Sequence, residues 1–184
     1  KWNIEIIKFI IPLAFIGVLV GTFTFSYLTN DHTRIIIGLI AIIFCLDYYF
    51  RKDSDKPKKP SKFASYFWPS LSGFTSFSIH AGGLPLSFYL LPMRLDRTMY
   101  VATAGLFYLL INLFKIFPYA YLGEMNFENI YTSLLLLPLA PLGVYFGAYL
   151  VDKIGQDWFY KIGYFCTLLA GCKLFYDGSI KLFL

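Results

Sequence analysis

Residues 12–21 read PLAFIGVLVG, and residues 138–147 read PLAPLGVYFG. The two segments are identical at six of ten positions, and the second follows the first by 126 residues. Apolar residues match by chance in a chain of this composition, but here one proline and both glycines also fall in register. We therefore predict an internal repeat, an arrangement that is common among membrane transporters.

The composition of the chain predicts a membrane protein. Apolar residues make up 58% of the 184 residues and charged residues 15%, with a mean hydropathy of +0.61. Soluble domains average about 45–50% and roughly 25%. The apolar runs are long enough for a hydrocarbon core about 30 Å thick. The predicted fold class is all-α, a polytopic helix bundle that crosses a cell membrane several times. Expected spans cover about residues 9–28, 34–50, 98–118, 130–150 and 162–182, and residues 63–93 form a broken apolar segment.

Residues 51–62 form a linker with six basic and two acidic residues. The positive-inside rule places this linker in the cytoplasm. Alternating crossings then put residues 29–33 and 151–161 on the outer side and return residues 118–129 to the cytoplasm, although 118–129 has no Lys or Arg. We interpret the net charge of +5 as a topology signal and expect no nucleic-acid partner.

The repeat and the linker together predict the organisation of the chain. Residues 1–50 are the C-terminal part of a first repeat, with two transmembrane helices, and residues 63–184 are a second repeat, with the broken helix and three more. Nothing in residues 1–11 corresponds to the segments that precede the second PLA motif. We therefore expect a first repeat that is incomplete at its N-terminus, in a protein of two four-segment repeats. Because four is even, both repeats should share one orientation.

The broken segment, SGFTSFSIHAGGLP at residues 72–85, holds the predicted solute site. Irregular backbone inside a bilayer survives only where it faces protein or a wet cavity. Gly82 and Gly83 permit backbone angles that other residues avoid, and Pro85 suits the first turn of a restarted helix. The N-terminus of that helix, at the membrane centre, would attract an anion. The expected substrate-binding residues are Ser76, Ser78, His80, Gly82, Gly83 and Pro85. The alternative is a kinked helix whose small residues serve packing.

Other polar residues in the apolar runs carry weaker signals. His80 suits anion binding or the relay of a coupled proton, and a neutral histidine bonded to a carbonyl is the alternative. Lys115 is expected to extend to the membrane surface, and Lys173 to pair with Asp177. The glycine pairs 17/21 and 143/147 are expected to serve close helix packing.

No motif indicates an enzyme, a metal site or a cofactor. The chain has no paired carboxylates, no activated nucleophile and no phosphate-binding loop. Cys45, Cys166 and Cys172 all lie in apolar runs and lack the spacing of zinc or disulfide frameworks. We therefore expect no catalytic residues, no metal and no cofactor.

The segments SGF (72–74), HAGGLP (80–85) and RT (97–98) resemble the second-half signature of the sulfite exporter TauE/SafE family. The twice-present PLAxxGxxxG pattern resembles that family's third span in each half. Leu84 departs from the pattern, since members often have a second proline there, and the glycine-rich span of the first half is absent.

The resemblance implies a secondary transporter of small anions, often sulfur-containing, in the bacterial inner membrane. We expect such an anion to bind at the broken helix and to be released by alternating access. The alternative function is a non-transporting membrane scaffold or assembly protein.

Overall fold

The computed structural model describes residues 2–24, 30–50, 56–123, 131 and 134–183. Helices account for the architecture of this part of the chain, and no strand occurs in it, so the all-α prediction is confirmed. The elements are α1 (Ile4–Thr24), α2 (Asn30–Phe50), α3 (Lys62–Ser78), α4 (Gly83–Leu90), the 3-10 turn η1 (Leu91–Met93), α5 (Arg97–Tyr121), α7 (Leu139–Lys153) and α8 (Gln156–Phe183).

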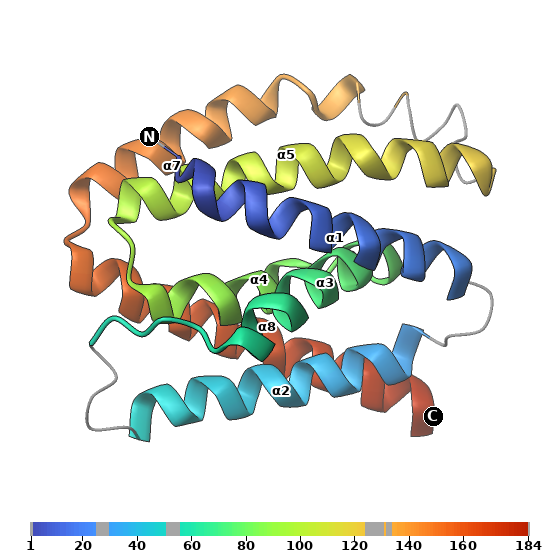
Figure 1. Cartoon of the computed structure of the whole chain (residues 1–184), viewed down its shortest axis with the longest axis horizontal. Helices are drawn as coiled ribbons and strands as arrows, with labels where there is room; N and C mark the ends of the chain where they lie inside the picture. The colour runs from blue at the N-terminus through green and yellow to red at the C-terminus, as the bar shows by residue number, and fades with distance from the viewer. Residues whose placement is uncertain (1, 25–29, 51–55, 124–130, 132–133, 184) are drawn as a thin grey trace.

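Most long helices lie along one common direction (Figure 1). Near their starts, α1 and α5 are joined by a 3.0 Å hydrogen bond from the Asn3 N–H to Thr103 Oγ1. Further along, the rings of Phe15 and Phe114 stack with centroids 4.1 Å apart. These two helices therefore run in the same direction, from what we call the linker end of the bundle, next to residues 56–61, to the far end, where Thr24 and Tyr121 lie.

The segment α3–α4 is a hairpin that enters the bundle and leaves at the same end. At its tip, the Ala81 N–H donates to the Thr75 carbonyl at 3.1 Å, and Ser72 Oγ donates to the Gly82 carbonyl at 2.7 Å. At its open end, the Lys58 N–H donates to the Pro92 carbonyl at 2.8 Å. The expectation of a broken helix that continues across the membrane is therefore wrong, because the chain reverses at residues 79–82.

The turn at residues 79–82 does not use its glycines as predicted. His80 takes the left-handed angle, with φ of 55°, whereas Gly82 has a right-handed helical backbone with φ of −59°. Gly82 is required for a different reason. A Cβ there would lie 2.6 Å from the Ser72 carbonyl oxygen and 2.6 Å from Ser76 Cβ, so the glycine lets α4 approach α3 closely.

The hairpin changes the expected topology. Because α3–α4 adds no crossing, α5 starts at the linker end and α8 follows at that end after α7 (Figure 1). The Arg97 guanidinium donates to the carbonyls of Ile154 and Asp152, and the Arg97 N–H donates to Gln156 Oε1 at 3.0 Å. Residues 151–161 thus lie at the linker end, not on the opposite side as expected.

The hairpin also changes the end of the bundle at which the segment after α5 begins. That helix brings the chain to the far end at Tyr121, so the return of residues 118–129 to the linker side is also wrong; residues 124–130 themselves lie outside the described part. Residues 118–123, which contain no Lys or Arg, lie at the far end, opposite the basic linker, in agreement with the positive-inside rule.

The two copies of the PLA motif run in opposite directions. The first lies in α1, which runs from the linker end to the far end, and the second lies in α7, which ends at the linker end (Figure 1). The expectation of one shared orientation is therefore wrong. It assumed that residues 63–93 cross the membrane, and the hairpin removes that crossing.

Close backbone contact joins α1 to α3. A Cβ at Gly17 would collide with the Ser70 carbonyl oxygen, and a Cβ at Gly73 would collide with that of Ala14. Such contact between small residues is a principal source of helix association in membranes. The predicted packing role of Gly17 and Gly21 is confirmed.

Three of the described helices are long and apolar enough to cross a membrane: Ile4–Thr24, Asp31–Phe50 and Arg97–Tyr121. The first begins at Ile4, before the expected residue 9, and residues 25–29 lie outside the described part. Instead of one span over 130–150, the described part contains α7 at Leu139–Lys153, and residues 124–130 and 132–133 lie outside it.

Single cysteines test the hairpin topology in a protein whose three native cysteines are replaced by alanine. We expect Lys59→Cys and Gly155→Cys to react with a membrane-impermeant maleimide from the same side of the membrane, and Tyr121→Cys to react from the other. Labelling of inside-out and right-side-out vesicles measures this. If Gly155→Cys reacts together with Tyr121→Cys, residues 62–93 cross the membrane and the hairpin is wrong.

Candidate functional site

A cavity of about 430 Å³ lies between the tip of the hairpin and α5. Four of the six predicted site residues line it, Ser76, His80, Gly82 and Gly83, together with Tyr108, Asn112, Lys115, Ile116 and Tyr119 of α5. We call this space the α5 cavity. The turn at residues 79–82 thus faces a polar surface that the sequence interpretation had not included.

The hairpin contributes backbone donors to the α5 cavity. In the first turn of α4, the Leu84 N–H donates to the Ala81 carbonyl and the Leu86 N–H to the Gly82 carbonyl, both at 3.3 Å. Pro85, as predicted, stands in this first turn and has no N–H. Among the described residues, the N–H groups of Gly82 and Gly83 have no acceptor. Unpaired donors at a helix N-terminus carry partial positive charge and favour an anion.

The opposite wall is a polar stripe on one face of α5. Tyr108, Asn112, Lys115 and Tyr119 follow one another at spacings of four, three and four, which places them on the same side of a helix. Residue-by-residue inspection of the sequence does not assign these four side chains to one site. The signal was present in the sequence as a helical period of polar residues within an apolar span.

Lys115 lies in this stripe and is buried, with 8% of its surface exposed. Its ammonium donates to the Ser76 carbonyl at 3.0 Å and to Ser76 Oγ at 3.1 Å. The expectation that Lys115 extends to the membrane surface is therefore wrong. Its side chain turns inward because α3 ends beside it and presents unpaired carbonyl oxygens, which attract a cation.

No carboxylate accompanies this buried ammonium among the described residues. An ammonium has three N–H donors, and two of the Lys115 donors are used by Ser76. Burying a charge without a counter-charge is costly. The site therefore combines an uncompensated cation with free backbone donors, which is the chemistry of an anion site.

His80 lies at the exposed edge of the α5 cavity. Its Nδ1 is 3.3 Å from the Ser76 carbonyl oxygen and 3.4 Å from the Tyr119 hydroxyl, which itself donates to the Phe77 carbonyl at 2.9 Å. A histidine bonded to a carbonyl was one of the two interpretations left open. Its ring lies at the exposed edge of the cavity, in contact with the Tyr119 hydroxyl.

Two of the predicted site residues do not line the α5 cavity. Ser78 is half-buried at the last position of α3, and Pro85 is buried in the first turn of α4. The site also lies nearer the far end than the membrane centre that was expected. Lys115 is six residues from the end of α5 at Tyr121, about 9 Å along the helix axis.

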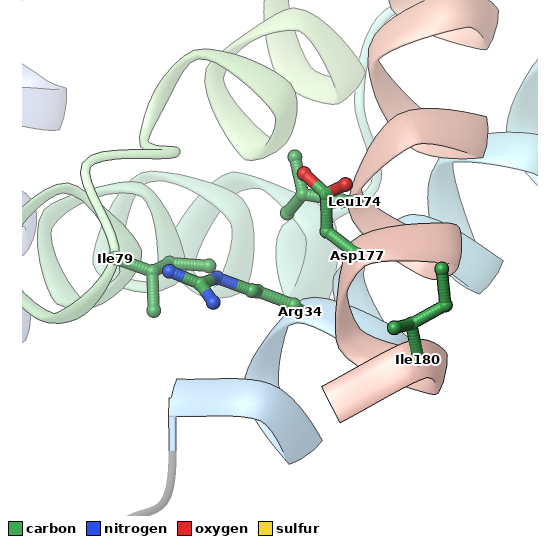
Figure 2. Close-up of a pocket in the computed structure, with 5 residues that line it drawn as sticks. All are labelled: Arg34, Ile79, Leu174, Asp177 and Ile180. Atoms are coloured by element: carbon green, nitrogen blue, oxygen red, sulfur yellow. The ribbon is translucent and has the colours of Figure 1, made fainter. Parts of the chain in front are cut away.

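A second cavity, of about 490 Å³, lies on the other side of the turn and is lined by Arg34, Ile79, Leu174, Asp177 and Ile180. Figure 2 shows the Arg34 guanidinium directed toward Ile79 and the Asp177 carboxylate beside Leu174. Arg34 pairs with Asp31 at 3.0 Å, and Asp177 pairs with Lys173 at 2.8 Å, as predicted for that pair. This α8 cavity carries charges of both signs, each already paired within its own helix.

Comparison with known proteins identifies the family. No curated protein and no solved structure matches the chain significantly. No group of three His, Cys, Asp or Glu side chains in the described residues is placed to hold a metal ion. The model of the family described as "Sulfite exporter TauE/SafE" matches residues 1–174. The chain is a membrane protein of the sulfite exporter TauE/SafE family, whose members are transporters of sulfite-type anions and not enzymes.

Proposed function

We propose that this protein is a secondary transporter of small oxyanions and that the anion binds in the α5 cavity. The observation that carries the proposal is the buried Lys115 ammonium, which is held by two neutral oxygens of Ser76 and has no carboxylate partner among the described residues. An anion in the cavity would supply the missing counter-charge. Sulfite and small sulfonates or carboxylates belong to the class that fits.

The proposed anion lies between Lys115 and the first turn of α4. Lys115 supplies a full positive charge, and the N–H groups of Gly82 and Gly83 supply directional donors. The Tyr108 hydroxyl is close to the same turn, since a Cβ at Gly83 would be 3.3 Å from it. Asn112 adds an amide to the lining. A sulfur oxyanion presents several acceptor oxygens around one centre and can use donors from both walls at once.

The proposed transport cycle is alternating access around the hairpin tip. The tip is a thin partition, because Ile79 lines the α8 cavity while its neighbour His80 lines the α5 cavity. The opposite directions of the two PLA motifs support an inverted repeat, and this design places a solute between two halves that rock against each other. We propose that the bacterial inner membrane is the site of this activity.

Replacement of Lys115 tests the proposed site. Lys115→Gln should reduce anion affinity by about 30-fold, since loss of one charge-assisted hydrogen bond costs about 2 kcal/mol. Uptake of radiolabelled sulfite into proteoliposomes measures this. Lys161→Gln is the matched control, because Lys161 is exposed and lines neither the α5 cavity nor the α8 cavity, and it should leave uptake unchanged.

Lys115 also caps the carboxyl end of α3, so a loss of uptake has to be separated from a loss of fold. In a background without the native cysteines, Lys115→Cys treated with 2-bromoethylamine regains an ammonium at nearly the original position. We expect uptake to return with the charge. A folded Lys115→Gln protein that transports sulfite normally would contradict the site, and Gly82→Leu, which closes the tip, serves as an inactive reference.

We further propose that His80 carries a proton that accompanies the anion, because it contacts both Ser76 and Tyr119 at the solvent edge of the cavity. His80→Gln should retain sulfite exchange at equal pH on both sides but lose accumulation driven by a pH gradient. Proteoliposomes with imposed gradients measure both. Equal dependence on the gradient in the variant and the native protein would exclude this role.

A further inference from the structure

The helix α7 is the least covered helix of the described bundle. None of its residues is buried, and a Cβ added at Gly143 or Gly147 would have nothing within 4 Å. The equivalent positions of the first PLA motif are in close contact. A Cβ at Gly17 would collide with Ser70 of α3, and one at Gly21 would meet Phe77 at 3.1 Å. The PLA motif thus makes a close helix contact in α1, and its glycines in α7 make no such contact with the described residues.

The contact between α2 and α8 locates the point about which the repeat would exchange these two antiparallel helices. A Cβ at Gly38 would lie 2.7 Å from the Gly171 carbonyl oxygen. Moving each residue to its repeat counterpart, 126 positions away, exchanges the helices and gives Tyr164 and Cys45. Cys45 Sγ contacts the Tyr164 carbonyl at 3.4 Å, so both pairs lie on one line of contact between the antiparallel helices.

The position of this contact also agrees with the repeat. When two antiparallel helices are exchanged in this way, the operation is a twofold rotation. Its axis passes through the point where a residue lies opposite its own repeat counterpart. Here that point lies at residues 41–42 of α2 and 167–168 of α8, within one turn of the middle of both helices. An offset arising by chance would have no reason to centre there. The twofold axis therefore lies across the helices, in the plane of the membrane, and it exchanges α1 with α7.

From the uncovered glycines of α7 and the twofold relation between the helices, we infer that the face of α7 formed by Ala140, Gly143 and Gly147 is a docking surface. Its occupant is a second re-entrant hairpin, the first-repeat counterpart of α3–α4 in the same protein. The α1–α3 contact gives its register. Gly73 approaches the Ala14 carbonyl and the Ser70 carbonyl approaches Gly17. The docked helix therefore carries a small residue opposite Ala140 and a close backbone opposite Gly143.

The twofold axis also determines how this hairpin enters. The α3–α4 hairpin comes in from the linker end (Figure 1), so its counterpart comes in from the far end. Its tip brings a second helix N-terminus into the membrane, and the solute pathway is then built from two hairpins of opposite direction. This architecture does not depend on which anion is carried.

Matched glycine substitutions test the docking surface. Gly143→Leu should lower the unfolding midpoint by about 4–8 °C, the usual effect of overpacking in a chain of this size. Gly17→Leu is the positive control. Gly105→Leu is the matched negative control, because a Cβ at Gly105 has nothing within 4 Å. If Gly143→Leu behaves like Gly105→Leu, the face meets only lipid and the inference is wrong.

A cysteine identifies the occupant. In protein without the native cysteines, Ala140→Cys should resist a lipid-soluble maleimide and form no disulfide-linked dimer on oxidation. Efficient dimer formation would show that a second copy covers α7 and would overturn the inference. Stability and labelling do not require transport. If the protein does not transport sulfite but gives the expected result in both tests, the proposed function is wrong and the docking surface still stands.

Discussion

The structure depends on one constraint, namely that the chain reverses direction inside an apolar bundle, where each backbone N–H and C=O group needs a partner. Most of these groups at the hairpin tip are satisfied locally. Ser72 bonds to the Gly82 carbonyl, Tyr119 to the Phe77 carbonyl and Lys115 to the Ser76 carbonyl. Among the described residues, the N–H groups of Gly82 and Gly83 have no acceptor, and both glycines line the α5 cavity. The candidate site is therefore a consequence of how the reversal is stabilised.

The reversal also decides the arrangement of everything that follows it. With no crossing contributed by residues 62–93, α5 and α1 run side by side, the basic residues near Arg97 gather at the linker end, and α7 runs opposite to α1. Arg97 binds carbonyls of the α7–α8 connection, and the Tyr160 hydroxyl donates to the Leu95 carbonyl at 2.7 Å. These contacts fix the open end of the hairpin, while its tip is held by α5.

The sequence predicted the helical membrane fold and the location of the irregular backbone, since composition and glycine and proline positions report on these directly. It did not predict the reversal, because a re-entrant hairpin and a broken span have the same apolar pattern. The direction of the Lys115 side chain depends on this reversal. Only when α3 ends beside α5 does a carbonyl become available to draw the ammonium inward. The α5 stripe was visible as a helical period, but its partner, the hairpin tip, was not.

The most direct measurement locates the anion itself. Selenite has the shape and charge of sulfite, and its selenium can be located by anomalous scattering in crystals of the protein. Binding at the proposed site predicts a selenium peak within hydrogen-bond distance of Lys115 Nζ, facing the first turn of α4, and absent from Lys115→Gln crystals. A peak beside Arg34 in the α8 cavity, with the α5 cavity empty, would contradict the central claim that the hairpin tip and Lys115 form the anion site.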